Sequence, residues 1–261
     1  MNDQVFGRNY AEQYDRIYAA KNYEAECDLL EAALRRFGAG AVESILDLGC
    51  GTGNHAFVLG RRGKRVTAVD RSAEMLNQAR DKAARASQTS DSPVPVFVQG
   101  DVRTVALEKT FDAVIMMFAV LGYQVANSDV TAALATVRRH LRPGGLFLFD
   151  AWYGPAVLSE RPTTQVKEFP LPGGKLIRIA SATLDTTHHT AKVQIRTLKI
   201  GESAPASDTI EIHDTRYFFP QELAQYLTTA GFQLLHMSAF PQLDRPPDQS
   251  SWNVFVVARA E

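Results

Sequence analysis

The stretch "ILDLGCGTGN" at residues 45–54 limits the fold of this chain more than any other part of its sequence. An apolar run that contains Asp47 leads directly into three alternating glycines, Gly49, Gly51 and Gly53. Such a run is typical of a buried parallel strand, and glycines at its end let the backbone approach a ligand closely. A helix that begins there adds its N-terminal N–H groups and its dipole. The stretch therefore predicts an α/β protein that holds a nucleotide-type ligand at the carboxyl edge of its sheet.

Strand and helix patterns alternate along most of the chain. We expect strands at 44–49, 65–70, 94–99, 111–117 and 145–150, with helices at about 53–62, 72–86 and 129–141. Strands that alternate with helices pair in parallel through right-handed crossovers, because both faces of each strand must be covered. A helix that opens at Pro220 and strands at 232–238 and 252–258 complete a core, which we assign to residues 44–151 and 219–261.

Two segments lie outside this core. Residues 1–43 are rich in aromatic side chains, and apolar residues from Tyr23 to Phe37 recur at helical spacing, which predicts a helical N-terminal lid. Residues 152–218 alternate apolar and polar side chains, as an antiparallel meander with one wet face does. We expect this inserted sheet to cap the substrate or to form the face of a homo-oligomer. The polar run at 86–93 predicts a loop.

Composition excludes several classes of partner. The chain of 261 residues has 28 Lys and Arg against 29 Asp and Glu, without the basic excess of a nucleic-acid-binding protein. Its two cysteines, Cys27 and Cys50, predict a reducing cytoplasm and no disulfide framework. No apolar run approaches membrane-spanning length, so we expect no membrane partner. His55, His188, His189 and His213 show no metal-ligand spacing, and we expect them to be solvated and the protein to hold no metal.

The glycine loop alone leaves the nucleotide open. Gly51, Gly53 and Ala56 fit the dinucleotide pattern G-x-G-x-x-A, so a nicotinamide-dependent oxidoreductase is one alternative. Asp70 ends the second strand, where a carboxylate accepts ribose hydroxyls in either cofactor. Asp101 follows the third strand, where an acid can accept the exocyclic amine of an adenine, for which dinucleotide folds have no regular need.

Five motifs then appear in order at the expected strand ends: "DLGCGTG", "AVDRSAEML", "QGDVR", "FDAVIMMF" and "LRPGG". Together they resemble the successive motifs of class I S-adenosylmethionine (SAM) dependent methyltransferases, over about residues 43–151 and most of 220–258. The resemblance implies a Rossmann-like sheet of seven strands in the order 3-2-1-4-5-7-6 with strand 7 antiparallel, which the order of elements here can supply. It also implies SAM as cofactor and S-adenosylhomocysteine as product.

The same resemblance implies which residues hold the cofactor. We expect Gly49 and Gly51 beside the methionine moiety, Asp70 on the ribose, Arg71 and Met75 near the adenine, Asp101 and Val102 at its polar edge, and Met117 beneath the sulfonium. Asp47, just ahead of the glycines, either orients the loop or meets the ammonium group of the ligand.

The acceptor is expected to be a small amine. The fourth strand is followed by "MFAVLGYQ" and lacks the Asn/Asp-Pro-Pro-aromatic signature of methylation on DNA bases. The segments "YDRIYAAKNYEAE", "MFAVLGY" and "FDAWY" are similar to those of amino-sugar N-methyltransferases of the desosamine and mycaminose type and of related antibiotic N-methyltransferases. Two positions depart from the nucleotide-sugar enzymes: "FDAWY" replaces an acidic-aromatic "EPWW", and Arg216 replaces an apolar residue.

Methyl transfer to an amine needs alignment and exclusion of water more than strong acid–base groups. The amine must lose a proton, to water or to a positioned hydroxyl or carboxylate. Aromatic walls also attract the positive sulfonium or ammonium. We therefore assign catalytic roles to Tyr10, Tyr18, Phe118 and Tyr123, and substrate contacts to Trp152, Tyr153 and Arg216.

The function we predict is thus a SAM-dependent N-methyltransferase of antibiotic biosynthesis that acts on an amino sugar or an amino-sugar-bearing natural product. An O-methyltransferase is the nearest alternative, and it would require a base or a metal poised at the acceptor. The nicotinamide-dependent oxidoreductase and a nucleotide-binding module without catalysis are the others.

Overall fold

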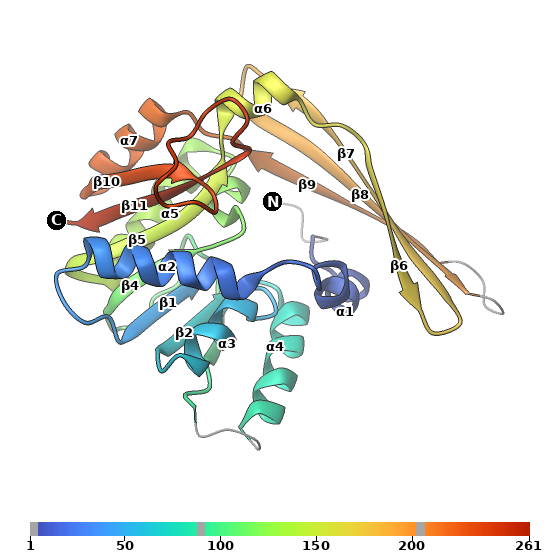
Figure 1. The fold of residues 1–261 in the computed structure, drawn as a ribbon, viewed down its shortest axis with the longest axis horizontal. Coiled ribbons are helices and arrows are strands. Elements are labelled where there is room, and N and C mark those ends of the chain that lie inside the picture. The colour runs from blue at the N-terminus through green and yellow to red at the C-terminus, as the bar shows by residue number, and fades with distance from the viewer. Residues whose placement is uncertain (1–4, 88–91, 202–206) are drawn as a thin grey trace.

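The computed structural model describes residues 5–87, 92–201 and 207–261. Its body is a seven-stranded sheet in the order β10-β11-β5-β4-β1-β2-β3, in which β11 runs antiparallel to both neighbours (Figure 1). This is the predicted order, with the last strand of the chain inserted between β5 and β10. The strands are β1 (Ser44–Leu48), β2 (Arg65–Asp70), β3 (Val96–Gln99), β4 (Phe111–Met116), β5 (Leu141–Trp152), β10 (Phe232–Ala239) and β11 (Asn253–Ala260).

Helices cover both faces of this sheet. Ile45 and Leu46, adjacent on β1, belong to two different buried clusters, one packed by α2 and α3 and the other by α5 and α7. A strand buried on both faces reads as a continuous apolar run, which is why β1 was recognisable. The helices are α2 (Tyr23–Phe37), α3 (Asn54–Arg61), α4 (Ala73–Ala86), α5 (Asn127–His140) and α7 (Pro220–Thr229).

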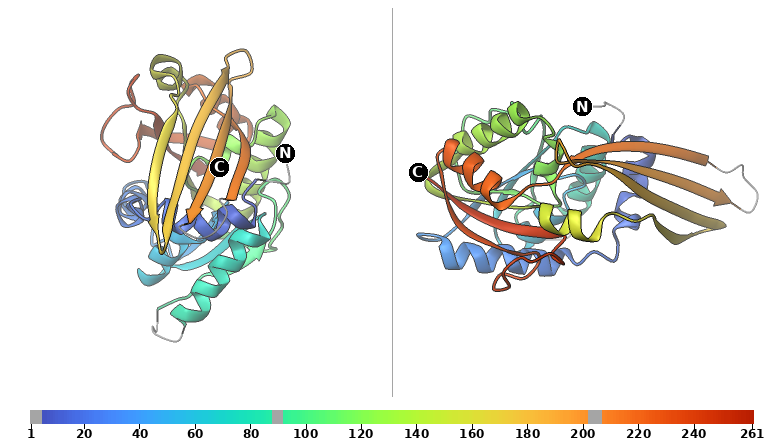
Figure 2. Two further views of the ribbon diagram at one scale, coloured as in Figure 1. Left: turned by 90° about the vertical axis from the view of Figure 1, so that its right-hand side faces the viewer. Right: turned by 90° about the horizontal axis from the view of Figure 1, so that it is seen from above.

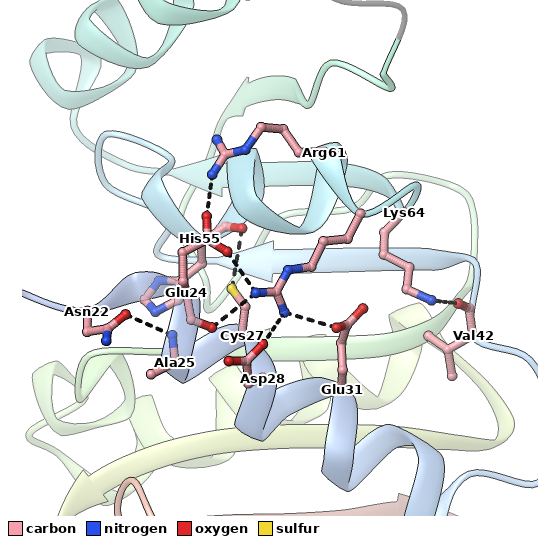
Figure 3. A network of polar contacts seen from close by, with 11 residues as sticks. Asn22, Glu24, Ala25, Cys27, Asp28, Glu31, Val42, His55, Arg61 and Lys64 are labelled. Atoms are coloured by element: carbon pink, nitrogen blue, oxygen red, sulfur yellow. Dashed lines mark hydrogen bonds and ion pairs between the residues drawn. The ribbon is translucent and has the colours of Figure 1, made fainter.

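An acidic and basic network fastens α2 to the end of α3. Arg62 reaches Glu24, Asp28 and Glu31 at 2.7, 2.8 and 3.0 Å, and Arg61 reaches Glu24 at 2.6 Å (Figure 3). The side chain of Asn22 caps the start of α2 by accepting from the N–H of Ala25. These contacts hold the helix that follows the glycine loop against its neighbour.

The inserted segment forms a separate four-stranded antiparallel sheet in the order β6-β7-β8-β9, as predicted for the meander. It projects from the end of the body at which the parallel strands finish, and α1 (Arg8–Ile17) lies between the body and this sheet (Figures 1 and 2). Tyr10 and Ile17 of α1 pack with Leu176, Ile195 and Met75. The strands are β6 (Gln165–Leu171), β7 (Gly174–Asp185), β8 (Thr190–Gly201) and β9 (Ser207–Arg216).

Several local features differ from the expectation. β5 begins at Leu141, directly after α5, because Leu141 already pairs with Phe111 before a register shift in the β4–β5 ladder. The 3-10 turn η1 (Val120–Tyr123) and the helix α6 (Gly154–Glu160) carry no long apolar period and were not predicted. Residues 88–91 of the predicted polar loop lie outside the described residues. Among the described helices, none is long and apolar enough to cross a membrane.

Candidate active site

A cavity of about 240 Å³ opens at the carboxyl ends of β1, β2 and β4, between the body and the N-terminal segment. Ten residues proposed from the sequence line it: Gly49, Gly51, Asp70, Arg71, Met75, Asp101, Val102, Met117, Phe118 and Tyr123. They follow different strands, and the shared edge of the sheet brings them together.

Gly49 and Gly51 differ in what a side chain at each position would contact. All three adopt left-handed backbone angles, with φ of 80°, 56° and 81° at Gly49, Gly51 and Gly53. A Cβ on Gly49 would lie 2.5 Å from Val120, whereas a Cβ on Gly51 would meet only the flexible end of Met75, at 3.2 Å. Gly49 therefore allows the turn after β4 to pack on the loop, and Gly51 keeps the cavity floor open to a ligand.

Asp70 shapes this loop from the next strand. Its Oδ2 accepts from the N–H of Gly51 and its Oδ1 from the N–H of Ser72, each at 2.8 Å. Burial raises the pKa of the carboxyl, while the two backbone donors oppose that rise. The side chain lines the cavity, so its remaining lone pairs face the place where a ligand hydroxyl would lie.

Asp101 lies in the cavity wall with an arginine clamped to it. Arg103 donates from Nε to Oδ1 at 2.9 Å and from Nη2 to Oδ2 at 2.7 Å, and it also pairs with Asp129 at 3.0 Å. The Arg103 hydrogen bonds lower the pKa of Asp101. Asp129 also lines the cavity, which sequence reasoning did not predict because this residue belongs to a helix and follows no strand end.

Asp47 is buried next to the loop and is absent from the cavity wall. Its Oδ2 has no hydrogen-bond partner among the described residues. Burial raises the pKa of Asp47 to about 7. An uncompensated acceptor at this depth is costly unless a cation or a donor approaches it.

The turn after β4 presents an aromatic ring to the cavity in a strained conformation. Phe118 and Ala119 have φ of 73° and 55°, a region that non-glycine residues rarely occupy. Asp150 holds both, because its Oδ1 accepts from their two N–H groups while its Oδ2 accepts from Asn253. The ring of Phe118 stays 37% exposed, with Lys21 Nζ 4.4 Å from its centroid.

The N-terminal segment closes one side of the cavity. Phe6, Tyr14 and Tyr23 line it. Asp15 fastens α1 to the loop by accepting from Thr52 Oγ1 at 2.6 Å and from Asn54 Nδ2 at 3.0 Å.

Two tyrosines proposed as catalytic lie behind this wall and do not line it. Tyr10 and Tyr18 share a hydrogen bond at 3.1 Å, and Tyr10 is packed in the cluster below the four-stranded sheet. The edge of the Tyr18 ring contacts Phe118, with ring centroids 5.0 Å apart. Their position supports the cavity wall from behind.

The three expected substrate contacts also lie outside the cavity wall. Trp152 packs edge-on against Trp252, and Tyr153 is buried in the body. Arg216 is buried as well and pairs with Glu222, while its Nη1 donates to Asn127 at 2.8 Å and to the carbonyl of Val125 at 3.2 Å. Arg216 thus joins β9 to α5 and α7.

The expectation that the histidines are solvated is wrong for His55 and His213. His55 is buried and bonds to Glu26 at 2.7 Å, and it lines the cavity. His213 is 2% exposed. Over residues 5–87, 92–201 and 207–261, no cluster of three or more His, Cys, Asp or Glu could hold a metal ion.

Further wall residues were not predicted. Some belong to the loop itself or to the turn after β4, and Ile212 and Asp214 come from β9, whose approach to the cavity has no signal in the sequence. They are Val5, Phe6, Tyr23, Cys50, Thr52, Asn54, His55, Val120, Gln124, Val125, Asp129, Ile212 and Asp214.

Comparison with known proteins decides among the cofactors that the loop allows. Residues 45–145, which build the floor of the cavity, match the family model described as a methyltransferase domain. These residues form a methyltransferase domain. A SAM-dependent methyltransferase from Clostridium acetobutylicum ATCC 824 shares the fold, with a TM-score of 0.80, 20% identity and coverage of 97% of this chain and 98% of that chain.

The names of two relatives of this chain describe enzymes that methylate amino sugars. The dTDP-3-amino-3,6-dideoxy-alpha-D-glucopyranose N,N-dimethyltransferase of Streptomyces fradiae is 27% identical over 88% of this chain and 86% of its own length. The dTDP-3-amino-3,4,6-trideoxy-alpha-D-glucopyranose N,N-dimethyltransferase of Streptomyces venezuelae is 30% identical over 58% of this chain and 61% of its own length.

Proposed function

We propose that this methyltransferase moves the methyl group of SAM to the amine of a small molecule, an amino sugar or a natural product that carries one. The observation that supports this most is the composition of the cavity. Its lining combines a polar part, formed by the glycine loop and Asp70, with an aromatic part, formed by Phe118, Tyr123 and Tyr14. The names of the two Streptomyces relatives support an amino-sugar acceptor.

The polar wall fits SAM. Gly51 leaves open space, Asp70 offers acceptors to the ribose hydroxyls, and Asp101 beside Val102 suits the exocyclic amine of the adenine. Arg71 and Met75 lie in the same wall. The unpartnered Oδ2 of Asp47 would meet the ammonium group of the methionine moiety only after a shift of the glycine loop, because Asp47 does not line the cavity.

Bound SAM supplies a methyl group activated by a sulfonium. The residues of the chain align the acceptor with it and keep water out. Phe118 is held rigidly by Asp150, and its ring face attracts a positive charge, as does that of Tyr123. Met117 directly follows β4 and also lines the cavity.

The inserted sheet completes the acceptor side in this proposal. Ile212 and Asp214 bring β9 to the cavity, and Asp214 offers a carboxylate to an ammonium or a sugar hydroxyl. We assign residues 1–43 to a lid, 152–218 to a cap or dimer face, and the remainder to the cofactor-binding core. Free thiols at Cys27 and Cys50 favour a cytoplasmic enzyme.

Transfer from methyl-labelled SAM to a panel of 3- and 4-aminohexose derivatives, each paired with its hydroxy analogue, tests the proposal. We expect label in the amines and none in the matched alcohols. Label in the alcohols alone would establish the O-methyltransferase alternative. Titration calorimetry with S-adenosylhomocysteine and with NAD, which we expect to show binding of the first alone, tests the oxidoreductase alternative.

A further inference from the structure

A chain of three side chains leads from the cavity wall into the protein. Tyr123, on η1, lines the cavity, and its Oη lies 3.1 Å from Nδ1 of His213 on β9. The other ring nitrogen of His213, Nε2, lies 3.2 Å from Oε2 of Glu211. His213 is 2% exposed, so these two contacts, rather than water, decide which of its ring nitrogens carries a proton.

The chemistry of Glu211 and Tyr123 decides which atoms donate the hydrogen bonds to and from His213. A carboxylate only accepts hydrogen bonds, so Nε2 of His213 carries a proton, and in the neutral imidazole this leaves Nδ1 as an acceptor. Nδ1 then accepts from the hydroxyl of Tyr123. Burial raises the pKa of Tyr123 above its ordinary value, which keeps that hydroxyl protonated.

We propose that Tyr123 takes the proton from the acceptor ammonium while passing its own proton to His213, with Glu211 stabilising the charge that results. This assignment rests on the proposed amine acceptor. One N–H bond of the ammonium breaks, the Oη–H bond of Tyr123 is replaced, and an Nδ1–H bond forms on His213. The freed lone pair of the amine attacks the methyl carbon as the methyl–sulfur bond breaks and S-adenosylhomocysteine leaves, and His213 is left as an imidazolium beside the carboxylate of Glu211.

The N-terminal segment completes this arrangement. Glu211 accepts from the backbone N–H of Phe6 at 3.2 Å and of Gly7 at 3.1 Å. The Phe6 ring packs against both His213 and Tyr123, with centroids 5.2 and 5.6 Å apart. Removing this segment after transfer would expose the imidazolium to water, to which it returns its proton.

Other charged or titratable groups face the chain from every side. Tyr10 of α1 lies with its ring centroid 6.1 Å from that of His213, and Tyr18 and Asp70 raise the pKa of Tyr123, whereas Arg178 of β7 lowers it. Asp214 is next to His213 in sequence and lines the cavity. The surroundings supply both signs of charge, and Glu211 makes the direct contact with His213.

The activity test compares His213→Gln with the wild type from pH 6 to 10, with saturating SAM. At neutral pH we expect kcat to fall about 100-fold, in the range typical of general acid–base catalysis, with KM for SAM unchanged. The deficit should shrink as pH rises, because the amine then loses its proton to solvent. A deficit that stays constant across the pH range would overturn the proposal. His188→Gln is the matched control, since His188 is exposed at the turn between β7 and β8.

A second measurement needs no turnover and no stable variant. In wild-type protein labelled with ¹⁵N-histidine, with S-adenosylhomocysteine added, NMR should show neutral His213 with its proton on Nε2. A proton on Nδ1 would sink the relay even in an active enzyme. If no amine accepts label while the Nε2 form is present, the proposed acceptor fails and the arrangement of the three side chains stands.

Discussion

The carboxylate of Asp70 accepts a hydrogen bond from the backbone N–H of Gly51, with 2.8 Å between Oδ2 and N. The end of β2 thereby sets the conformation of the loop that follows β1. The same side chain lines the cavity. A substitution at Asp70 therefore acts on the ligand and on the loop together, and a conservative change is needed to separate them.

Asp70→Asn should weaken the binding of S-adenosylhomocysteine about 10- to 100-fold, the equivalent of one hydrogen bond to a charged group. The amide oxygen can accept from Gly51 or from Ser72 but not from both, so the melting temperature should fall as well. Calorimetric titration measures the affinity for S-adenosylhomocysteine, and thermal unfolding measures the melting temperature. Asp208→Asn removes a carboxylate on exposed β9 that pairs with Arg196, and it should leave affinity unchanged. Equal affinity in Asp70→Asn would contradict the assignment to the ribose.

Gly51→Ala tests whether the open space above the loop is ligand space. The backbone at Gly51 has a φ of 56°, and an added methyl group would meet only Met75 Cε, at 3.2 Å. The left-handed backbone should cost about 1–2 kcal/mol of folding stability. Gly63→Ala imposes the same kind of cost at φ of 85° with nothing within 4 Å. We expect both variants to lose stability and Gly51→Ala alone to lose affinity for S-adenosylhomocysteine, by tenfold or more. Parallel losses of affinity would refute this reading.

Arg216→Leu should destabilise the protein without changing its affinity for either substrate. The change leaves Glu222 without its buried partner, and breaking such a pair costs about 3–5 kcal/mol. Urea unfolding at pH 7 measures the loss, and adding Glu222→Leu should recover part of it. Arg196→Leu, which breaks an exposed ion pair, is the control and should change stability little. A higher KM for the acceptor with normal stability would show a substrate contact after all.

Asp47 predicts how the stability of the ligand-free protein depends on pH. Burial raises its pKa to about 7 from the ordinary value of 3.8, so the folded state binds one more proton than the unfolded state between these two pH values. Stability from this group is therefore present below about pH 4 and is lost as pH rises toward 7. Asp47→Asn, which stays neutral, should have a higher melting temperature than the wild type at pH 8, with little difference at pH 4. The reverse order at pH 8 would show that the carboxylate already has a partner.

The sequence allowed the body of the fold to be predicted because local pattern and global topology agree there. β1 and β4 are apolar runs bounded by turns, and the glycines and acids that matter follow strand ends. Such residues share an edge once the strands are parallel. The cavity wall from Gly49 to Met117 follows from that rule.

The other wall depends on contacts that no local pattern encodes. Tyr123 meets His213 across 90 residues, and Phe6 meets Glu211 across 205. Tyr153 follows a strand end, yet its bridge to Phe218 directs it into the body. Apolar and polar residues alternate in the sequence around Arg216, a pattern that does not predict a buried ion pair. Only the approach of α7 gives Arg216 its partner, Glu222. Placement of the inserted sheet decides these cases.

The inserted sheet leaves and rejoins the body at nearly one point. Tyr153 and Phe218 form a bridge, and the N–H of Gly154 donates to the carbonyl of Phe218 at 2.8 Å. The outer parts of the strands between these residues can lengthen, shorten or diverge while the strands of the seven-stranded sheet keep their register. If the inserted sheet covers the acceptor as we propose, exchange of residues 154–217 between relatives should change which acceptor is methylated while the cofactor-binding core stays the same.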